Sequence, residues 1–180
     1  MTPSNFSVDV AATGLDWVGG GIRSISSLLD ELIRNARHSL DITAYSVTDG
    51  AAVVFDALEK RLRDGVTVRL VVDNLADRRK AAARALLAPM LDRFPGNFQL
   101  WDYPKRDVSE MAGLHAKLLI ADRSRALVGS ANLSFLGLAA SHELAVCVNG
   151  QAANTVALCF DRLVVSSHVS KCTTSKDLPE

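Results

Sequence analysis

The alternation of helical and extended patterns in the first half of the chain constrains its fold more than any other feature. Apolar residues recur at helical spacing over residues 22–37, and the alternating run SLDITAYSV follows over residues 39–47. A second helical pattern over residues 49–65 leads into VTVRLVVD, residues 66–73, which is near-continuously apolar, as a buried parallel strand is. Helices that alternate with such strands predict an α/β fold.

The second half of the chain predicts further strands and a closing helix. A third helix is expected over residues 77–93, where Pro89 favours a kink or an early end. Strands are expected at residues 97–103, 114–121, 126–130 and 142–149, and a helix at 151–167. Together the patterns predict a mixed β-sheet flanked by helices on both faces. We expect one domain over residues 22–168, a flexible lead-in over 1–21 and a frayed tail over 169–180.

Composition narrows the classes of function. The 180 residues are 48% hydrophobic and 22% charged, which is typical of a globular domain and excludes a disordered chain. Twenty basic and twenty acidic residues cancel, so no global positive field attracts nucleic acid, and any polyanion must be met locally. The candidate contacts are the cations of DRRKAAAR and PKRD: Arg78, Arg79, Lys80, Lys105 and Arg106. A solvated helix face and a solvated loop explain these two runs equally well.

Cysteine usage and hydropathy bear on the compartment. The chain has three cysteines, an odd number without a C-x-x-C spacing, which indicates reduced thiols and argues against a structural zinc site. The first residues lack the basic and apolar segments of a signal peptide, and no apolar run is long enough to span a bilayer. We therefore expect a cytoplasmic protein without a membrane span.

The stretch LHAKLLIADRSRALVGSANLS, residues 114–134, carries the candidate chemistry. Alternate side chains of a strand share a face, so His115 and Lys117 are expected to point the same way. Ser130 and Asn132 have the same even spacing on the paired strand, and all four side chains can converge on one patch. An imidazole surrounded by an ammonium, a hydroxyl and an amide suits a phosphate or another tetrahedral oxyanion.

Three neighbours of this patch are given supporting roles. Gly129 lets a ligand approach the backbone closely. Asp122 has the opposite parity, so we expect it to brace the turn through backbone N–H groups or neighbouring arginines. Glu143 begins the next strand and is the candidate to accept a hydrogen bond from His115, which would fix the tautomer of the imidazole. A surface glutamate that flanks a strand is the alternative for Glu143.

A lone histidine on an apolar strand is usually a satisfied core residue, but six fixed residues form a more specific pattern. This pattern resembles the signature of the phospholipase D superfamily: His-x-Lys, four residues, Asp, six residues, then Gly-Ser-x-Asn. Here it consists of His115, Lys117, Asp122, Gly129, Ser130 and Asn132, with every spacing matched. The segment from residue 33 to residue 73 also looks like the first helix, strand, helix and strand of that family, and the resemblance covers residues 22–160.

The resemblance implies a reaction and roles for the motif residues. In that family the motif histidine attacks phosphorus and forms a covalent phosphohistidine, and a second motif histidine protonates the leaving oxygen. His115 is thereby assigned as nucleophile or acid, and Lys117, Ser130 and Asn132 as clamps for the phosphate oxygens. The resemblance implies neither a metal ion nor another cofactor.

The reaction needs two histidines, but the chain carries the motif once. Short members of the family pair two chains across a twofold axis, so the resemblance implies a homodimer with its interface beside His115. Within one chain the alternative acid is His142, but it adjoins Glu143 and so faces the opposite way. His38 and His168 lie near predicted helix ends, and we expect no catalytic role for them.

The substrate class also follows from the resemblance. Short single-motif members look like nucleases that act on DNA or RNA, sometimes in bacterial defence, which favours a metal-independent nuclease. A phospholipase D or phosphatidyl transferase is the first alternative; it needs an exposed apolar surface such as LSFLGL, residues 133–138, a stretch that we expect to pack in the core. A non-catalytic phosphate-binding module in a larger complex is the second alternative, and the intact motif argues against it.

Overall fold

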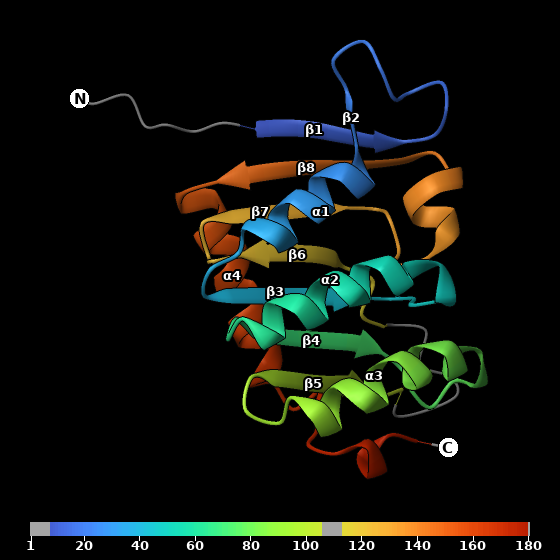
Figure 1. The fold of residues 1–180 in the computed structure, drawn as a ribbon, viewed down its shortest axis with the longest axis vertical. Helices are drawn as coiled ribbons and strands as arrows, with labels where there is room; N and C mark the ends of the chain where they lie inside the picture. Colours follow the sequence, from blue (N-terminus) through green and yellow to red (C-terminus); the bar gives the residue numbers. More distant parts are fainter. Residues whose placement is uncertain (1–7, 106–112, 180) are drawn as a thin grey trace.

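The computed structural model describes residues 8–105 and 113–179, and these form one nine-stranded mixed sheet with helices on both faces (Figure 1). The strands are β1 (Val8–Thr13), β2 (Arg23–Ser24), β3 (Ser39–Ala44), β4 (Thr67–Asp73), β5 (Phe98–Tyr103), β6 (Lys117–Ala121), β7 (Arg125–Gly129), β8 (Glu143–Asn149) and β9 (Ser170–Cys172). Their order in the sheet is β2-β1-β8-β7-β6-β3-β4-β5-β9. β3, β4 and β5 are parallel, whereas β6, β7 and β8 form an antiparallel meander beside β3.

Four longer helices cover the sheet. They are α1 (Ile25–Asn35), α2 (Ala52–Arg63), α3 (Ala81–Arg93) and α4 (Gln151–Val164). Figure 1 shows α1, α2 and α3 on one face and α4 on the other, so the predicted fold class is confirmed. The larger core lies beneath α1 to α3, and a smaller core of Val71, Trp101, Ile120, Ala126 and Phe160 lies beneath α4.

Local chemistry explains where these helices begin and continue. The Ser24 hydroxyl accepts the N–H of Ser27 at 3.2 Å, which caps α1 where its apolar stripe begins. The predicted helix over residues 77–93 starts as a 3₁₀ turn, η2 (Arg78–Lys80), and continues as α3 through Pro89 to its expected end. Pro89 therefore does not shorten the helix, contrary to one of the outcomes expected for it.

The two ends of the chain differ from the sequence expectation. Part of the expected lead-in forms β1, which pairs with β8 from Val8 opposite Val148 to Thr13 opposite Glu143. Part of the expected frayed tail forms β9, which pairs with β5 and buries Cys172. β1 lies next to the edge strand β2, and the three-residue β9 forms the other edge of the sheet. The partners β8 and β5 are distant from them in the sequence. Tertiary pairing therefore decides their structure, and local propensity does not.

Candidate active site

The candidate site lies at the edge of the sheet where β3 and β4 end and β6 begins. β3 and β6 are antiparallel, with Thr43 opposite Leu118, so the start of β6 adjoins the end of β3. The carboxyl ends of parallel strands are where α/β folds usually bind ligands. The topology thus brings the segment that contains His115 to the carboxyl edge of β3 and β4.

The backbone on the amino-terminal side of His115 is held by Asp73, the last residue of β4. The Asp73 carboxylate is only 2% exposed, and it accepts the N–H of Leu114 at 2.9 Å. This approach needs a glycine at position 113, because a Cβ there would lie 2.8 Å from Asp73 Oδ1. The His115 side chain itself is exposed. The imidazole is therefore accessible, and the backbone just before it is held in place by Asp73.

The backbone on the other side of His115 is held by Thr43 of β3. The Thr43 hydroxyl donates to the carbonyl of Ala116 at 2.7 Å and accepts the N–H of Leu118 at 3.2 Å. One hydroxyl thus satisfies two backbone groups where β6 starts. The position of His115 is consequently set by two residues from neighbouring parallel strands.

Lys117 is buried next to His115. Its side chain is 7% exposed, and its ammonium donates to the His115 carbonyl at 2.7 Å. Burial lowers the pKa of Lys117, and the nearby carboxylates of Glu143 and Asp73 oppose this shift. A partly desolvated ammonium interacts more strongly with an anion than one in water does. Lys117 is thus placed to bind a phosphate next to the imidazole.

Ser130 is paired with Glu143 in this structure. The Ser130 hydroxyl donates to the Glu143 carboxylate and accepts the N–H of Leu144 at 3.2 Å. No hydrogen bond between His115 and Glu143 is found among the described residues, which departs from the predicted role of Glu143. The register explains the difference, because Gly129 is the partner of Ala145, and this places Ser130 beside the first residues of β8.

Strand packing by itself calls for a glycine at position 129, and the close approach of a ligand there stays a prediction. Gly129 lies opposite Lys117 on one side and Ala145 on the other. A Cβ on Gly129 would lie 2.6 Å from the Ala145 Cβ and 2.7 Å from the Leu144 carbonyl oxygen. The close approach of β8 therefore requires a glycine here, whatever ligand is present.

Asn132 lies just beyond the end of β7. Its side-chain oxygen is buried without a hydrogen-bond partner among the described residues. Its backbone is covered by Gly137, where a Cβ would lie 2.5 Å from the Asn132 carbonyl oxygen. Gly137 belongs to a π-helical turn, η3 (Leu136–Ala140), a local geometry that is frequent at functional sites. A buried amide with an open hydrogen-bonding position can serve a ligand.

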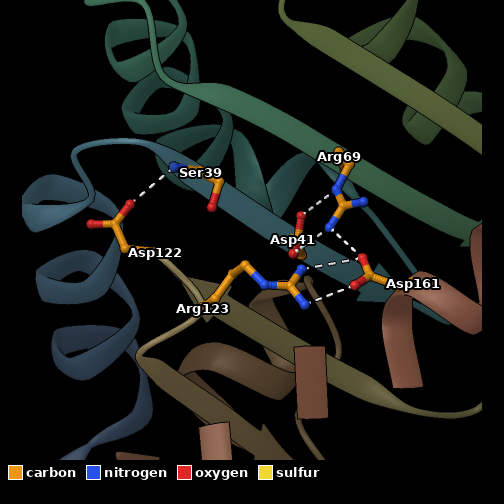
Figure 2. Close-up of polar contacts among 6 residues, drawn as sticks. All are labelled: Ser39, Asp41, Arg69, Asp122, Arg123 and Asp161. Carbon is orange, nitrogen blue, oxygen red and sulfur yellow. Dashed lines mark hydrogen bonds and ion pairs between the residues drawn. The ribbon is translucent and has the colours of Figure 1, made fainter. Parts of the chain in front are cut away.

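Asp122 lies at the opposite edge of the sheet. Its carboxylate accepts the N–H groups of Arg37, His38 and Ser39 at 2.9, 2.7 and 2.9 Å, and Figure 2 shows the contact with Ser39. Burial would raise the pKa of Asp122, but these three donors outweigh it and hold the pKa below its ordinary value. Asp122 thus braces the connection between α1 and β3, which fits the bracing role expected for it better than a place in the catalytic group.

The candidate nucleic-acid contacts differ among themselves. Arg78 and Arg79 are exposed, and Arg79 pairs with Asp77 at 2.6 Å. Lys105 is exposed, and Arg106 lies outside the described residues. Lys80 is only 7% exposed, so the structure contradicts a surface role for this lysine. The reason is that Lys80 ends the η2 turn, and its ammonium reaches inward to donate to the backbone carbonyl of Tyr45.

Tyr45 is the site residue that the sequence analysis missed. Its ring centroid lies 4.8 Å from that of His115, and both the Lys80 and Lys117 ammonium groups lie near its face. The signal was the aromatic residue at the carboxyl end of a predicted parallel strand, in the run SLDITAYSV.

The other histidines with described contacts have neighbours away from this group. The His142 ring packs edge-on against Trp17 at 5.1 Å, and its Nε2 lies 3.8 Å from the Asp16 carboxylate. The His168 ring stacks on Tyr103 at 6.1 Å. Neither contact involves the residues around His115.

The side chains and helices of residues 8–105 and 113–179 bear on metal binding and on membrane insertion. No group of three or more His, Cys, Asp or Glu side chains in these ranges is placed to hold a metal ion. No helix in them is both long enough and apolar enough to cross a membrane.

Comparison with known sequences identifies relatives of the chain. A family model described as cardiolipin synthase, PLD-like domain, matches residues 29–164. The DISARM protein DrmC of Bacillus paralicheniformis is 25% identical over 165 residues, which are 92% of this chain and 66% of DrmC. The chain thus spans just under two thirds of the length of this relative.

Comparison with solved structures shows the same fold. The phospholipase D family member Nuc from Salmonella typhimurium has a TM-score of 0.71 at 22% identity, over 94% of this chain and 99% of Nuc. NucT from Helicobacter pylori has a TM-score of 0.70 at 17% identity, over 88% and 96%. Phosphatidylserine synthase from Haemophilus influenzae has a TM-score of 0.73 at 16% identity, over 99% of this chain but 43% of the synthase.

Proposed function

The chain belongs to the phospholipase D-like family of phosphodiesterases, and we propose that within this family it is a nuclease that cleaves DNA or RNA without a metal ion. The observation that carries the proposal is the meeting of His115, Lys117 and Ser130 at one edge of the sheet, in a motif with every spacing matched. The exposed His115 is the nucleophile, and Lys117, Ser130 and Asn132 bind the phosphate oxygens.

The proposed reaction has two steps. In the first, a ring nitrogen of His115 attacks phosphorus, the bond from phosphorus to the leaving oxygen breaks, and that oxygen takes a proton from the His115 of a second chain. In the second, water attacks the phosphohistidine and gives its proton to the same second histidine, which releases a phosphate monoester and restores both imidazoles. The predicted hydrogen bond from His115 to Glu143 requires a change in the pairing of Glu143 with Ser130, and it stays a prediction.

A nucleic acid is favoured as substrate by the exposed cations around the same edge. Arg78 and Arg79 follow the carboxyl end of β4, and Lys105 follows the carboxyl end of β5. These three residues therefore lie on the side of the sheet where His115 lies, where they can contact phosphates that flank the scissile one. The balanced net charge of the chain limits binding to this local group.

A homodimer is proposed because the chemistry needs a second histidine. His142 and His168 contact Trp17 and Tyr103, which gives neither a place beside His115. The match to the synthase covers 43% of that longer chain, which leaves room in it for a second domain of this size. Two copies of the present chain would likewise supply two domains of this kind, and with them two motif histidines.

A phospholipid is the second candidate substrate. Phe135 and Leu136, just beyond Asn132, are 62% and 63% exposed, although the sequence analysis expected this stretch to pack in the core. Leu133 is buried, so only part of the stretch follows that expectation. The matched family is described as that of a cardiolipin synthase, and an exposed apolar rim beside the site would suit a lipid surface.

Cleavage in excess EDTA tests the proposal. Wild type, His115→Asn and the matched control His168→Asn would be incubated with labelled single- and double-stranded DNA and RNA. We expect wild type and His168→Asn to cut, and His115→Asn to lose at least about 10³-fold in rate. Retained cutting by purified His115→Asn would overturn the mechanism. If no nucleic acid is cut, vesicles of phosphatidylglycerol or cardiolipin test the second candidate.

The shared site has its own test. Wild type and His115→Asn would be co-expressed in varied ratios, and the mass in solution would be recorded for each sample. If both histidines of a dimer are needed, activity falls as the square of the wild-type fraction. A fall in simple proportion to that fraction would show that each chain acts alone.

A further inference from the structure

The ring of Tyr45 is the common neighbour of three charged or reactive groups at the site. The His115 ring lies 4.8 Å away with a tilt of 57° between the two planes. The Lys80 and Lys117 ammonium groups lie 4.7 and 5.2 Å from the Tyr45 centroid. Because a cation near an aromatic face is attracted by the ring quadrupole, both lysines help to hold this ring in place.

Lys80 is an unusual residue to find in this position. Its side chain is almost fully buried, and no carboxylate lies within 4.0 Å of its ammonium in the part of the chain that the structure describes. Burial lowers the pKa of Lys80, and Asp73 and Asp77 act in the opposite direction from further away. Burial of an ammonium without a paired carboxylate is costly for stability, which points to a role in the site.

Lys80 contacts both the backbone and the ring of Tyr45. The ammonium donates to the backbone carbonyl of Tyr45 and also lies near its ring. Lys80 is itself held at the end of η2, where its N–H donates to the Asp77 carbonyl at 2.8 Å. The start of α3 is thereby tied to the end of β3, and the ring of Tyr45 is held where it meets His115.

His115 depends on this contact for its orientation. The imidazole is exposed and makes no side-chain hydrogen bond with a described residue, so contact with the Tyr45 ring is what limits its rotation. In-line attack on phosphorus needs the attacking nitrogen aligned with the bond that breaks, and misplacement by about 1 Å can cost about 10²-fold in rate.

We propose that Tyr45 and Lys80 are positioning residues for His115: Tyr45 sets the orientation of the imidazole, and Lys80 holds Tyr45. This inference rests on the proposed role of His115 as nucleophile. It replaces the surface role that the sequence analysis gave to Lys80 and assigns a role to Tyr45.

Steady-state kinetics on a cleaved nucleic acid provide the first test. Tyr45→Leu and Lys80→Met should each lower kcat by about ten- to a hundredfold and leave KM within about twofold, because orientation is lost but the phosphate clamps remain. Tyr45→Phe keeps the ring, and Lys80→Arg keeps the charge and a donor, so both should recover most of kcat. Lys60→Met, at an exposed lysine of α2, is the matched control and should match wild type.

The kinetic outcomes decide between positioning and direct binding. A rise in KM with unchanged kcat in Lys80→Met would show that Lys80 binds substrate phosphate, and it would overturn the inference. Unchanged kcat and KM in both Tyr45→Leu and Lys80→Met would overturn it as well. Recovery in Tyr45→Phe and Lys80→Arg guards against a trivial loss of folded protein.

A measurement without substrate separates this inference from the proposed function. The ring-proton resonances of His115 in NMR spectra should shift in Tyr45→Leu and Lys80→Met, and stay near their wild-type positions in Tyr45→Phe. Tyr103→Leu is the matched control, because it removes the ring that stacks on His168 and should move only the His168 resonances. If wild type cuts no nucleic acid but the His115 resonances respond as expected, the proposed function fails and the positioning contact stands. Unmoved His115 resonances in Tyr45→Leu would overturn the contact even in an active enzyme.

Discussion

Charged side chains lie near both ends of strands β3 and β4, and the two ends differ in how these charges are paired. At the amino ends, Asp41 and Arg69 pair with each other and with a second ion pair from neighbouring elements (Figure 2). At the carboxyl ends, the ammonium groups of Lys80 and Lys117 are buried, and neither has a carboxylate within 4.0 Å among the described residues. The amino ends thus carry a closed network, in which Asp41, Arg69, Arg123 and Asp161 pair with one another. The ammonium groups at the carboxyl ends have no such ion-pair partner among the described residues.

The closed network is complete within the chain. Arg69 donates to both oxygens of Asp41 at 2.6 and 2.7 Å and to Asp161 at 2.9 Å. Arg123 donates to Asp161 at 2.7 Å from the other side, and Figure 2 shows the four side chains together. Asp41 is only 1% exposed, and Arg69 is the ion-pair partner of its carboxylate. Such a network offers little to a ligand, and its role is structural.

The difference between the two ends suggests that charges at the amino ends serve stability and charges at the carboxyl ends serve activity. A buried ion pair whose members satisfy each other gives a large penalty when one partner is removed. A buried cation without a counter-ion already carries that penalty, and at Lys117, the proposed phosphate clamp, an anionic ligand can relieve it. Loss of a charge should therefore lower stability at the amino edge and activity at the carboxyl edge.

The largest expected effect on stability comes from Arg69→Met. It leaves Asp41 buried and unpaired, so we expect the free energy of unfolding to fall by about 3–5 kcal/mol. Activity per folded molecule should stay at the wild-type level. Urea unfolding measures the first quantity and cleavage kinetics the second. The matched control is Arg34→Met, which removes the solvent-exposed side chain paired with Asp30 on α1 and should change the free energy of unfolding far less. Equal losses of unfolding free energy in the two variants would contradict the structural role of the network at the amino ends.

The next effect, on activity, comes from Lys117→Met, which keeps most of the stem and removes the ammonium. We expect kcat/KM to fall about 10²–10³-fold, as when a donor to a developing charge is lost. The free energy of unfolding should stay the same or rise, because a buried, unpaired charge is removed. Lys60→Met is again the matched control. A variant that unfolds more easily than wild type but cleaves normally would reverse the assignment of this edge.

The parts of the fold that follow from local pattern were predictable. SLDITA and TVRLVVD became β3 and β4, because their apolar content and period are properties of the strands alone. β1 and β9 were not predicted, because each pairs with a strand far along the chain, and β9 has only three residues. Strand pairing of this kind depends on tertiary contacts that no local window contains.

The candidate site divides in the same way. The shared face of His115 and Lys117 follows from the two-residue period of a strand. The partner of Glu143 depends on the register between β7 and β8, which sequence period does not fix. The burial of Lys80 depends on where the start of α3 packs, and a charge run in sequence gives no sign of it.

A smaller effect on stability is expected for Asp122→Asn at the amino edge. The amide keeps one acceptor and turns two donors towards a cluster of three backbone N–H groups. We expect a loss of about 1.5–3 kcal/mol, the range for hydrogen bonds to a charged group. Asp56→Asn, on the exposed face of α2, should change the free energy of unfolding by less than about 0.5 kcal/mol. If Asp122→Asn lowered kcat and left stability unchanged, Asp122 would belong with the catalytic group.

The smallest effect is the pH dependence of that loss. The three backbone donors hold the folded-state pKa of Asp122 below its ordinary value, so its contribution to stability is fully present above the unfolded pKa, about 3.9. It is lost as the pH falls through the lower folded pKa. The difference in unfolding free energy between wild type and Asp122→Asn should therefore be constant from pH 7 to about pH 5 and narrow below about pH 4. Urea unfolding at each pH measures it, and a difference that widens towards acid pH would mean that the carboxylate is not held in its charged form by these donors.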